Sequence, residues 1–339
     1  MYSVSLPQPT IAVTIFGIQI PKTNPGTAST PTVALTTLDT LLSNHPTHTQ
    51  PLVQDGPITP EATYTTHIRL TYWATPSHFT EWWESPAVST FWRTLPPTAG
   101  IYRETLQIPT PKTQIGTNKL TKNGQGHLAS YAGTDKMGYW GCYYDRMSGV
   151  GRANKGNHVS PLKTAPCRRE STGTLRPGRV AVTRLPENLC FVVEGQDHSD
   201  VSAAEKDYWF AHFDGPVKRW VADLVAAGPE AGVLDARVCF DPSQGRLADS
   251  GEEALGYNRK TELFWFLDME CMERLGRMNA GHVALRREFL KAYGPGGEME
   301  GGRACLWVET SILPADGVEC EYIGCVDGTG LMGLEWAQE

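Results

Sequence analysis

The chain has 339 residues and a mass of 37.3 kDa, with 40% hydrophobic and 20% charged residues. This is the composition of an ordinary globular protein, long enough for one large domain or two subdomains. The net charge of -7 comes without any Lys/Arg-rich block, so neither nucleic acid nor an anionic membrane is an expected partner.

The N-terminal residues Met1 to Pro7 lack the basic start and long apolar run of a secretory signal, and no later segment reaches membrane-spanning length. The eight cysteines are scattered without a CxxC pair, which is typical of buried thiols in a reducing compartment. We therefore expect a cytoplasmic protein.

The first 58 residues are rich in Thr and Pro. They predict an extended arm with one helix-like segment around Thr37 to Leu42. The folded domain is then expected over residues 59–339.

A strand, helix, strand pattern follows the arm. The β-branched and aromatic run Thr63 to Trp73 predicts a strand, Pro76 opens a helix, and Ile101 to Leu106 predicts a second strand. The pattern recurs about 193 positions later. Its second occurrence comprises a strand over Thr261 to Leu267, a helix over Glu270 to Gly276 and a strand over Ala304 to Ile312. We therefore predict an α+β fold with two ferredoxin-like halves, roughly residues 59–180 and 181–339.

The region between the two occurrences predicts one long buried strand over Val180 to Val193. Ser202 then caps a helix that Gly215-Pro216 should kink. Residues 118–138 and 148–177 are rich in Gly and Lys and poor in apolar residues, so we predict loops there.

A histidine lies on the apolar stripe of a predicted helix near the C-terminus. The stripe recurs every three or four residues and comprises Met272, Leu275, Asn279, His282, Arg286 and Phe289. An imidazole in an apolar pocket can bind a haem iron, but the spacing alone favours a hydrogen-bonded core histidine.

Several separated stretches, in the same order, resemble the haem-containing aldoxime dehydratases. They comprise Ala62 to Trp83, Gly100 to Glu104, Gly138 to Gly141, Pro186 to Cys190, Gly195 to Asp197, Glu273 to Leu285, Leu306 to Glu309, and Glu321 to Leu331. The resemblance covers most of the chain after residue 52.

The resemblance implies a dimeric α+β barrel that binds haem b, with His282 as the proximal iron ligand and residues 59–339 as the haem-binding domain. It also implies the family reaction, in which an aldoxime bound through its nitrogen loses water and becomes a nitrile. A homodimer and a small substrate with an N-O or N-N group are the implied partners.

The chain departs from the family pattern on the distal side. Val308 stands where the family has the acid-base histidine, and Glu194 stands where it has a serine. The family's Met-Arg-Asp-Arg is Tyr143-Tyr144-Asp145-Arg146 here, so only one of two arginines is kept.

These departures single out replacements for the missing groups. Glu194 is the candidate proton donor, and Arg146 and Tyr144 are further catalytic candidates. We expect Val308 and Gly195 to line the cofactor site, Gly195 because it permits a close approach of the backbone.

Each candidate also has a structural alternative. Glu194 could be a solvated carboxylate at the end of a strand, and Arg146 could simply pair with Asp145. His198 and His127 are expected to be surface or capping histidines.

Four functional classes remain open on the sequence. The first is a haem-dependent lyase acting on an aldoxime. The second is a divergent biosynthetic haem enzyme doing other N-O or N-N bond chemistry on a hydroxylamine, nitrone or hydrazine. The third is a haem peroxidase, and the fourth is a non-catalytic haem binder.

Overall fold

The computed structural model describes residues 1–22, 30–55, 64–249 and 253–336, and most of the sheet is built from two copies of one β-α-β-β-α-β pattern. The first copy comprises β2 (Thr10–Pro21), α1 (Thr30–Leu42), β3 (His48–Asp55), β4 (Tyr64–Trp73), α2 (Pro76–Glu84), α3 (Pro86–Thr94) and β5 (Ile101–Pro109). The second comprises β10 (Leu189–Asp197), α5 (Ala203–His212), α6 (Asp214–Ala227), β11 (Val233–Phe240), β12 (Arg259–Phe266), α7 (Met269–Met278), α8 (Ala280–Tyr293) and β13 (Cys305–Leu313). The predicted correspondence of β4, α2 and β5 with β12, α7 and β13 is confirmed by this element order.

The remaining elements extend the edges of the sheet or form short insertions. They are β1 (Tyr2–Ser5), β6 (Thr113–Thr117), β7 (Ser130–Gly133), α4 (Cys142–Arg146), β8 (Cys167–Arg168), β9 (Arg179–Val182), β14 (Val318–Ile323) and β15 (Leu334–Glu335). Pairing of β3 with β11 joins both copies into one sheet of 13 strands, in the order β7-β1-β6-β13-β10-β12-β11-β3-β4-β2-β5-β14-β9.

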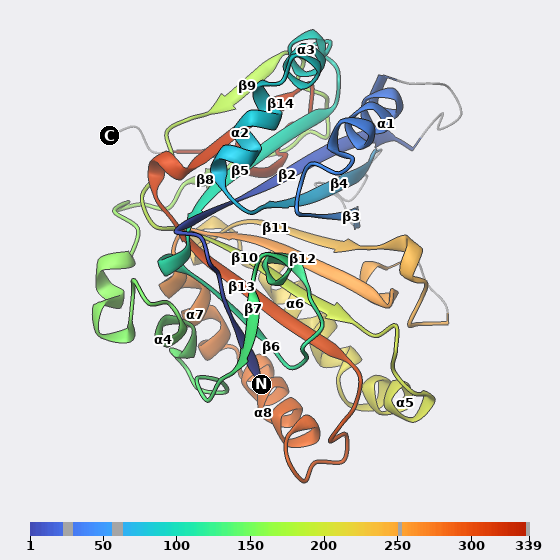
Figure 1. Ribbon diagram of the computed structural model, residues 1–339, viewed down its shortest axis with the longest axis vertical. Helices are drawn as coiled ribbons and strands as arrows, with labels where there is room; N and C mark the ends of the chain where they lie inside the picture. The colour runs from blue at the N-terminus through green and yellow to red at the C-terminus, as the bar shows by residue number, and fades with distance from the viewer. Residues whose placement is uncertain (23–29, 56–63, 250–252, 337–339) are drawn as a thin grey trace.

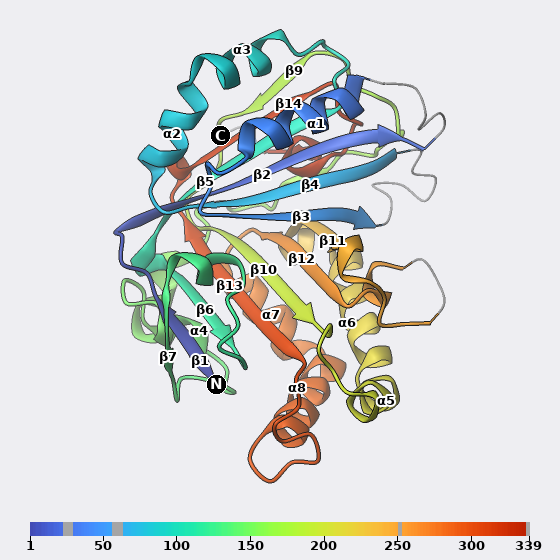
Figure 2. The ribbon, with the colours of Figure 1, turned by 45° about the vertical axis from the view of Figure 1, so that its right-hand side comes forward.

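The two copies form two layers of strands with helices on the outside. Figure 1 shows the first copy in the upper half beneath α1, α2 and α3, and the second in the lower half with α6, α7 and α8 along its strands. Figure 2 shows the same arrangement after a turn of 45°. Both halves are mixed α+β, as predicted.

Alternate residues of each strand face opposite sides, so one side of each layer builds a shared core and the other packs under helices. The shared core between the copies includes Ile15 and Leu70 from the first and Phe191 and Trp265 from the second. Val192, the neighbour of Phe191, belongs to a separate cluster under the helices of the second copy.

A buried ion-pair network also joins the two copies. The Arg237 guanidinium on β11 lies 2.5 Å from Glu104 on β5 and 2.6 Å from Asp235. Glu104 also accepts a hydrogen bond of 2.6 Å from the Tyr322 hydroxyl. Removing one partner of such a buried pair costs about 3–5 kcal/mol, so the network fixes how the copies face each other.

One glycine in each copy lies beneath an aromatic ring of the neighbouring strand. Gly195 is paired with Trp307, and Gly17 is paired with Tyr102. A methyl group on Gly195 would lie 2.1 Å from the indole, and one on Gly17 would lie 2.0 Å from the phenol ring. The glycines therefore allow the aromatic side chains to lie flat across the strands.

Replacing Gly195 with alanine should destabilise the protein by about 1–3 kcal/mol, because the added methyl group overpacks a buried site. The measurement is urea unfolding at constant protein concentration. Gly133→Ala is the matched control, since its added methyl would meet no atom within 4 Å. Equal unfolding midpoints for the two variants would contradict the steric explanation.

The first 58 residues do not form the predicted arm where the structure describes them. Residues 10–21 form β2, a central strand of the first copy whose residues are largely buried. Only the helix-like segment Thr37 to Leu42 is confirmed, as the end of α1. The predicted boundary at residues 58 and 59 lies outside the described residues. The Thr and Pro content of the segment favoured an arm over a strand. Residues 11–19 are buried on both faces, so they do not show the alternation of a half-exposed strand.

The two copies span residues 10–109 and 189–313, so the first predicted half, roughly residues 59–180, omits β2, α1 and β3. The single strand predicted over Val180 to Val193 is also wrong. It is two strands, β9 at the sheet edge beside β14 and β10 between β13 and β12. Pro186 separates them, since it cannot donate to a strand ladder.

Two predicted helices are broken rather than continuous. Ser202 caps α5 as predicted, and its side chain accepts a hydrogen bond of 3.2 Å from the Glu205 N-H. The helix does not continue to Gly215-Pro216 with a kink. Instead α5 ends before Phe213, and Pro216 lies in the first turn of α6. The C-terminal helix is divided at Asn279 into α7 and α8.

All eight cysteines are free thiols; seven are buried, as predicted, and Cys167 is exposed. Over the ranges that the structure describes, no helix combines the length and apolar character needed to cross a membrane.

Candidate functional site

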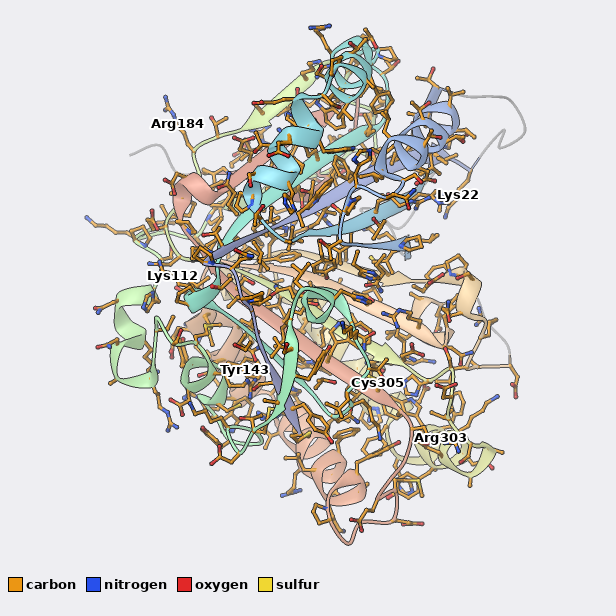
Figure 3. The ribbon with its side chains drawn as sticks, in the orientation of Figure 1. Lys22, Lys112, Tyr143, Arg184, Arg303 and Cys305 are labelled. Atoms are coloured by element: carbon orange, nitrogen blue, oxygen red, sulfur yellow. The ribbon has the colours of Figure 1, made fainter. Side chains whose placement is uncertain are left out.

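A cavity lies between the outer face of the second copy's strands and the helices that cover them. Its volume is about 250 Å³, close to the lower end of the roughly 300–1,000 Å³ of most ligand pockets. Strands β10, β12 and β13 form the floor, and α4, α6, α7 and α8 form the walls. The apolar and aromatic lining residues include Trp140, Tyr143, Trp220, Phe264, Phe266 and Phe289. Figure 3 labels Tyr143 in this lower half of the molecule.

His282 lies on the helical wall of the cavity, in the first turn of α8. The Asn279 side chain caps this helix and accepts a hydrogen bond of 2.9 Å from the His282 backbone N-H. The imidazole stacks on Trp220, with centroids 4.0 Å apart and an interplanar angle of 14°. His282 therefore faces an apolar pocket, at the place where the sequence predicted it.

The hydrogen bonding of the His282 imidazole leaves its Nε2 able to bind a metal. Its Nδ1 lies 2.9 Å from the Gly276 carbonyl oxygen, which can only accept, so Nδ1 carries the proton. Burial lowers the pKa of His282 to about 4, so the ring is neutral at physiological pH. A neutral imidazole whose Nδ1-H is bonded to a backbone carbonyl presents Nε2 as a ligand, and flat aromatic walls suit a planar cofactor. The residues of the cavity therefore fit a haem.

Glu194 lies on the floor of the same cavity. It is partly buried, and its neighbours in the strand register are Val308 on β13 and Glu262 on β12. Burial raises the pKa of Glu194 to about 7, although the nearby Arg286 opposes the shift. Of the two positions expected from the sequence, a solvated strand end and the cavity, the structure shows the second.

Glu262 is a second carboxyl of the cavity floor that the sequence analysis missed. Its side chain is 1% exposed, and neither oxygen has a hydrogen-bond partner among the described residues. The alternation of β12 could have revealed it, because Glu262 shares a face with Phe264 and Phe266.

The Arg146 side chain on the short helix α4 lines the cavity and does not pair with the Asp145 carboxylate. Arg146 Nε donates to Gln114 at 2.7 Å, while Nη2 is buried without a partner among the described residues. Asp145 instead pairs with Arg152 at 2.6 Å. The alternative that Arg146 serves as the ion-pair partner of Asp145 therefore does not describe this structure.

The structure does not bring Tyr144 to the cavity. Tyr144 is 1% exposed and packs in the hydrophobic cluster with Met147 and Val150. Its neighbour Tyr143 lines the cavity instead, and burial together with the negative charge of Glu194 raises the pKa of Tyr143 to about 12. Successive residues of a helix point about 100° apart, and in α4 this turn places Tyr143 on the cavity side and Tyr144 in the core cluster.

Val308 and Gly195 both border the cavity, as expected. Val308 is an apolar neighbour of Glu194, and the glycine at 195 is required by the Trp307 ring that covers it.

His198 and His127, the two other histidines considered from the sequence, lie outside this lining. His198 is 1% exposed, so its assignment to the surface is wrong; its ring packs against Trp209 with centroids 4.3 Å apart. His127 is half-buried and stacks on His48, with ring centroids 3.6 Å apart.

Comparison with known proteins gives a family match over nearly the whole chain. A family model described as haem-containing dehydratase matches residues 14–331. The crystal structure of the aldoxime dehydratase OxdRE in complex with butyraldoxime is similar, with a TM-score of 0.78 and 17% identity over 99% of this chain and 89% of that chain. A second aldoxime dehydratase structure has a TM-score of 0.77 and 17% identity, covering 100% of this chain and 92% of the other. No curated protein sequence matches the chain.

Proposed function

The chain belongs to the haem-containing dehydratase family, and from this premise we propose that it is a haem b lyase that converts an aldoxime to a nitrile and water. One observation carries the proposal. A neutral imidazole, His282, lies on one wall of an aromatic cavity whose floor presents a carboxyl, Glu194. The similar OxdRE structure was determined with butyraldoxime, which supports an oxime as substrate.

His282 would hold the haem through Nε2, and Trp140, Trp220 and Phe264 would line the space that it occupies. When bound, the haem supplies an iron with an open coordination position for the substrate nitrogen. Two guanidinium groups offer positive charge to anionic or oxygen-bearing groups. Arg286 lies over the Trp140 ring at 4.2 Å from its centroid, and Arg146 Nη2 has no hydrogen-bond partner among the described residues.

Glu194 would protonate the leaving oxygen of the oxime. As the proton reaches oxygen, the N-O bond breaks and its electron pair leaves with water. The carbon then loses its proton, and the C-H electron pair forms the third carbon-nitrogen bond. One proton is given and one returned, so no oxidant or reductant is consumed. Val308, opposite Glu194 in the register, cannot transfer a proton, which leaves the donor role to the carboxyl.

Val308 and Glu194 differ from the residues that the family pattern has on the distal side. This difference supports a second candidate, a haem enzyme that acts on another N-O or N-N bond, such as that of a hydroxylamine, nitrone or hydrazine. The two candidates share the cofactor and the substrate nitrogen, and they differ in the product. We also propose that the halves form the ferredoxin-like barrel of the family and that two copies associate as a homodimer.

The deciding experiment is an absorption spectrum of the haem-loaded protein, oxidised and then reduced with dithionite, before and after an aldoxime is added. The proposed function predicts a Soret band that moves when the oxime meets the reduced protein, followed by nitrile in the product analysis. A moving band without nitrile would favour the second candidate. No Soret band after reconstitution would overturn both.

Arg146→Ala should raise the KM for the aldoxime by about tenfold or more, because a hydrogen bond from a charged donor contributes roughly 1.5–3 kcal/mol. The Soret band of the resting protein should stay unchanged. Steady-state kinetics provides the measurement, with Arg152→Ala as control, since Arg152 is a mostly exposed partner of Asp145. An unchanged KM would remove Arg146 from the substrate site.

A further inference from the structure

Two carboxyl groups face each other on the cavity floor. Glu194 and Glu262 are paired in the antiparallel register of β10 and β12, so both side chains leave the same face of the sheet. Residues opposite one another in such a pair have Cβ atoms about 4.5–5.5 Å apart. Both carboxyls line the cavity, and β10 and β12 run side by side in Figures 1 and 2.

Among the described residues, no side chain forms an ion pair or a hydrogen bond with Glu262. Both of its oxygens are buried without a hydrogen-bond partner in the described part of the chain. Lys260, two residues before it, uses its ammonium group to donate to the Leu255 carbonyl at 2.9 Å. Buried, hydrogen-bonded carboxylates are common in proteins, but a buried carboxylate without partners is costly, so this environment favours the neutral acid of Glu262.

Charged and titratable groups reach the pair from every side of the cavity. Arg286 from α8 favours the ionised form of Glu194, and Lys260 from β12 favours that of Glu262. Tyr143 from α4 and His282 from α8 line the same space as neutral groups. Burial, followed by the charge of Glu194, raises the pKa of Glu262 to about 8 despite Lys260.

We infer that Glu194 and Glu262 form a proton-sharing pair, in which Glu262 acts as a positioning residue that keeps one proton available to Glu194. The inference rests on the proposed function, which gives Glu194 the role of donor. Two facing carboxyls in a poorly hydrated site do not both ionise, so the pair holds one proton at neutral pH.

One shared proton suits a dehydration that needs an acid first and a base second. The pair gives its proton to the oxime oxygen, which leaves as water, and is then doubly ionised and strongly basic. It takes back the proton that the oxime carbon releases as the nitrile forms. The pair ends each turnover with the proton count it began with.

Infrared spectroscopy of the full-length protein tests the pair without depending on activity. In variant-minus-wild-type difference spectra recorded across a pH series, the carboxylic acid C=O band of each glutamate is identified by its loss in Glu194→Gln or Glu262→Gln. Coupling predicts that Glu194→Gln lowers the midpoint at which Glu262 ionises by about one pH unit or more. Glu262→Gln should likewise lower the Glu194 midpoint, so either variant suffices if the other fails to fold.

The pH dependence of stability gives a second readout. A carboxyl whose pKa is higher in the folded than in the unfolded state binds its proton more tightly when folded, so its contribution to stability falls as pH rises between the two values. For Glu262 that window runs from about 4.5 to about 8. Glu262→Gln should therefore gain stability relative to the wild type as the pH rises through this window.

Glu309→Gln is the matched control. Glu309 is a buried glutamate on the neighbouring strand β13, with its pKa also raised to about 8, but it accepts hydrogen bonds from the Gln125 N-H at 3.0 Å and from Tyr72. Its register position is next to Val308, so its side chain leaves the opposite face of the sheet. This variant should remove one carboxylic acid band and leave both midpoints of the pair unchanged.

The outcomes separate this inference from the proposed function. Unchanged midpoints in both single variants, or a Glu262 that is ionised throughout the series above pH 5, would overturn the pair even if the protein makes nitrile. A coupled pair in a protein that makes no nitrile would retain the inference as a proton-sharing site and reject the aldoxime reaction. With both intact, Glu262→Gln should move the alkaline limb of the pH profile of kcat/KM to lower pH by about one unit, which Glu309→Gln should not.

Discussion

Replacing His282 with alanine is expected to weaken haem binding by about 100-fold or more and to change the Soret band of any haem that remains. Loss of a residue that merely supports a metal ligand typically costs 10–100-fold in affinity, and loss of the ligand itself should lie at or above that range. Haem titration of the apo-protein, followed at the Soret band, gives the affinity.

Two further variants separate ligation from a packing defect. His198→Ala removes another buried histidine of the second copy that lies outside the cavity lining, and it should leave the Soret band in place. In His282→Gly, added imidazole should occupy the vacated space beside Trp220 and restore the ligand field. An unchanged Soret band in His282→Ala would show that the iron is held by another group.

The repeat and the position of His282 on a helix that faces the cavity could be predicted from the sequence, because both depend on local patterns. The strand, helix, strand pattern from Tyr64 to Pro109 and its second occurrence from Arg259 to Leu313 follow apolar periodicity. His282 followed from a helical stripe and a resemblance. Although Asn279 divides the helix, Met272 from α7 and both His282 and Phe289 from α8 still line the same cavity.

The errors arose where tertiary pairing overrides local composition. β2 contains the polar residues Thr14 and Gln19, yet it lies between β4 and β5, so both are buried by neighbours more than 40 positions away. The same reasoning explains Glu262. Nothing in the run Thr261 to Leu267 shows which strand lies beside it. Only the pairing of β10 with β12 shows that Glu194 lies opposite Glu262. Cross-strand partners far apart in sequence cannot be deduced from the periodicity of one strand.

The choice between Tyr143 and Tyr144 failed for a different reason. Alignment with a family motif gives the order of residues, but the direction of each side chain depends on where the short helix α4 begins. With Gly141 in a left-handed conformation at φ 90°, α4 starts at Cys142 and turns Tyr144 into the core.

Replacing Glu194 with glutamine is expected to lower kcat for aldoxime dehydration by about a hundredfold to ten-thousandfold, the usual loss when a positioned general acid is removed. Haem affinity and the oxime-induced Soret shift should be retained, because the amide keeps the size of the side chain. The acid is present below its pKa of about 7, so wild-type activity should decline as the pH rises through that value, and the variant should lose this limb of the profile. Full turnover by Glu194→Gln would remove the carboxyl from the reaction.

A second substitution can show whether a histidine at position 308 can replace the Glu194 carboxyl as proton donor. Val308 lies directly opposite Glu194 and borders the same cavity, at the position where the family pattern has its acid-base histidine. Adding Val308→His to Glu194→Gln should recover part of the lost kcat, with an acidic donor whose pKa is that of an imidazole rather than of a buried carboxyl. Recovery would mean that the proton can be delivered from either of two adjacent strands to the same substrate oxygen. If the double variant stays as slow as Glu194→Gln while it still binds oxime, the substrate oxygen must lie on the β10 side of the cavity, beyond the reach of β13.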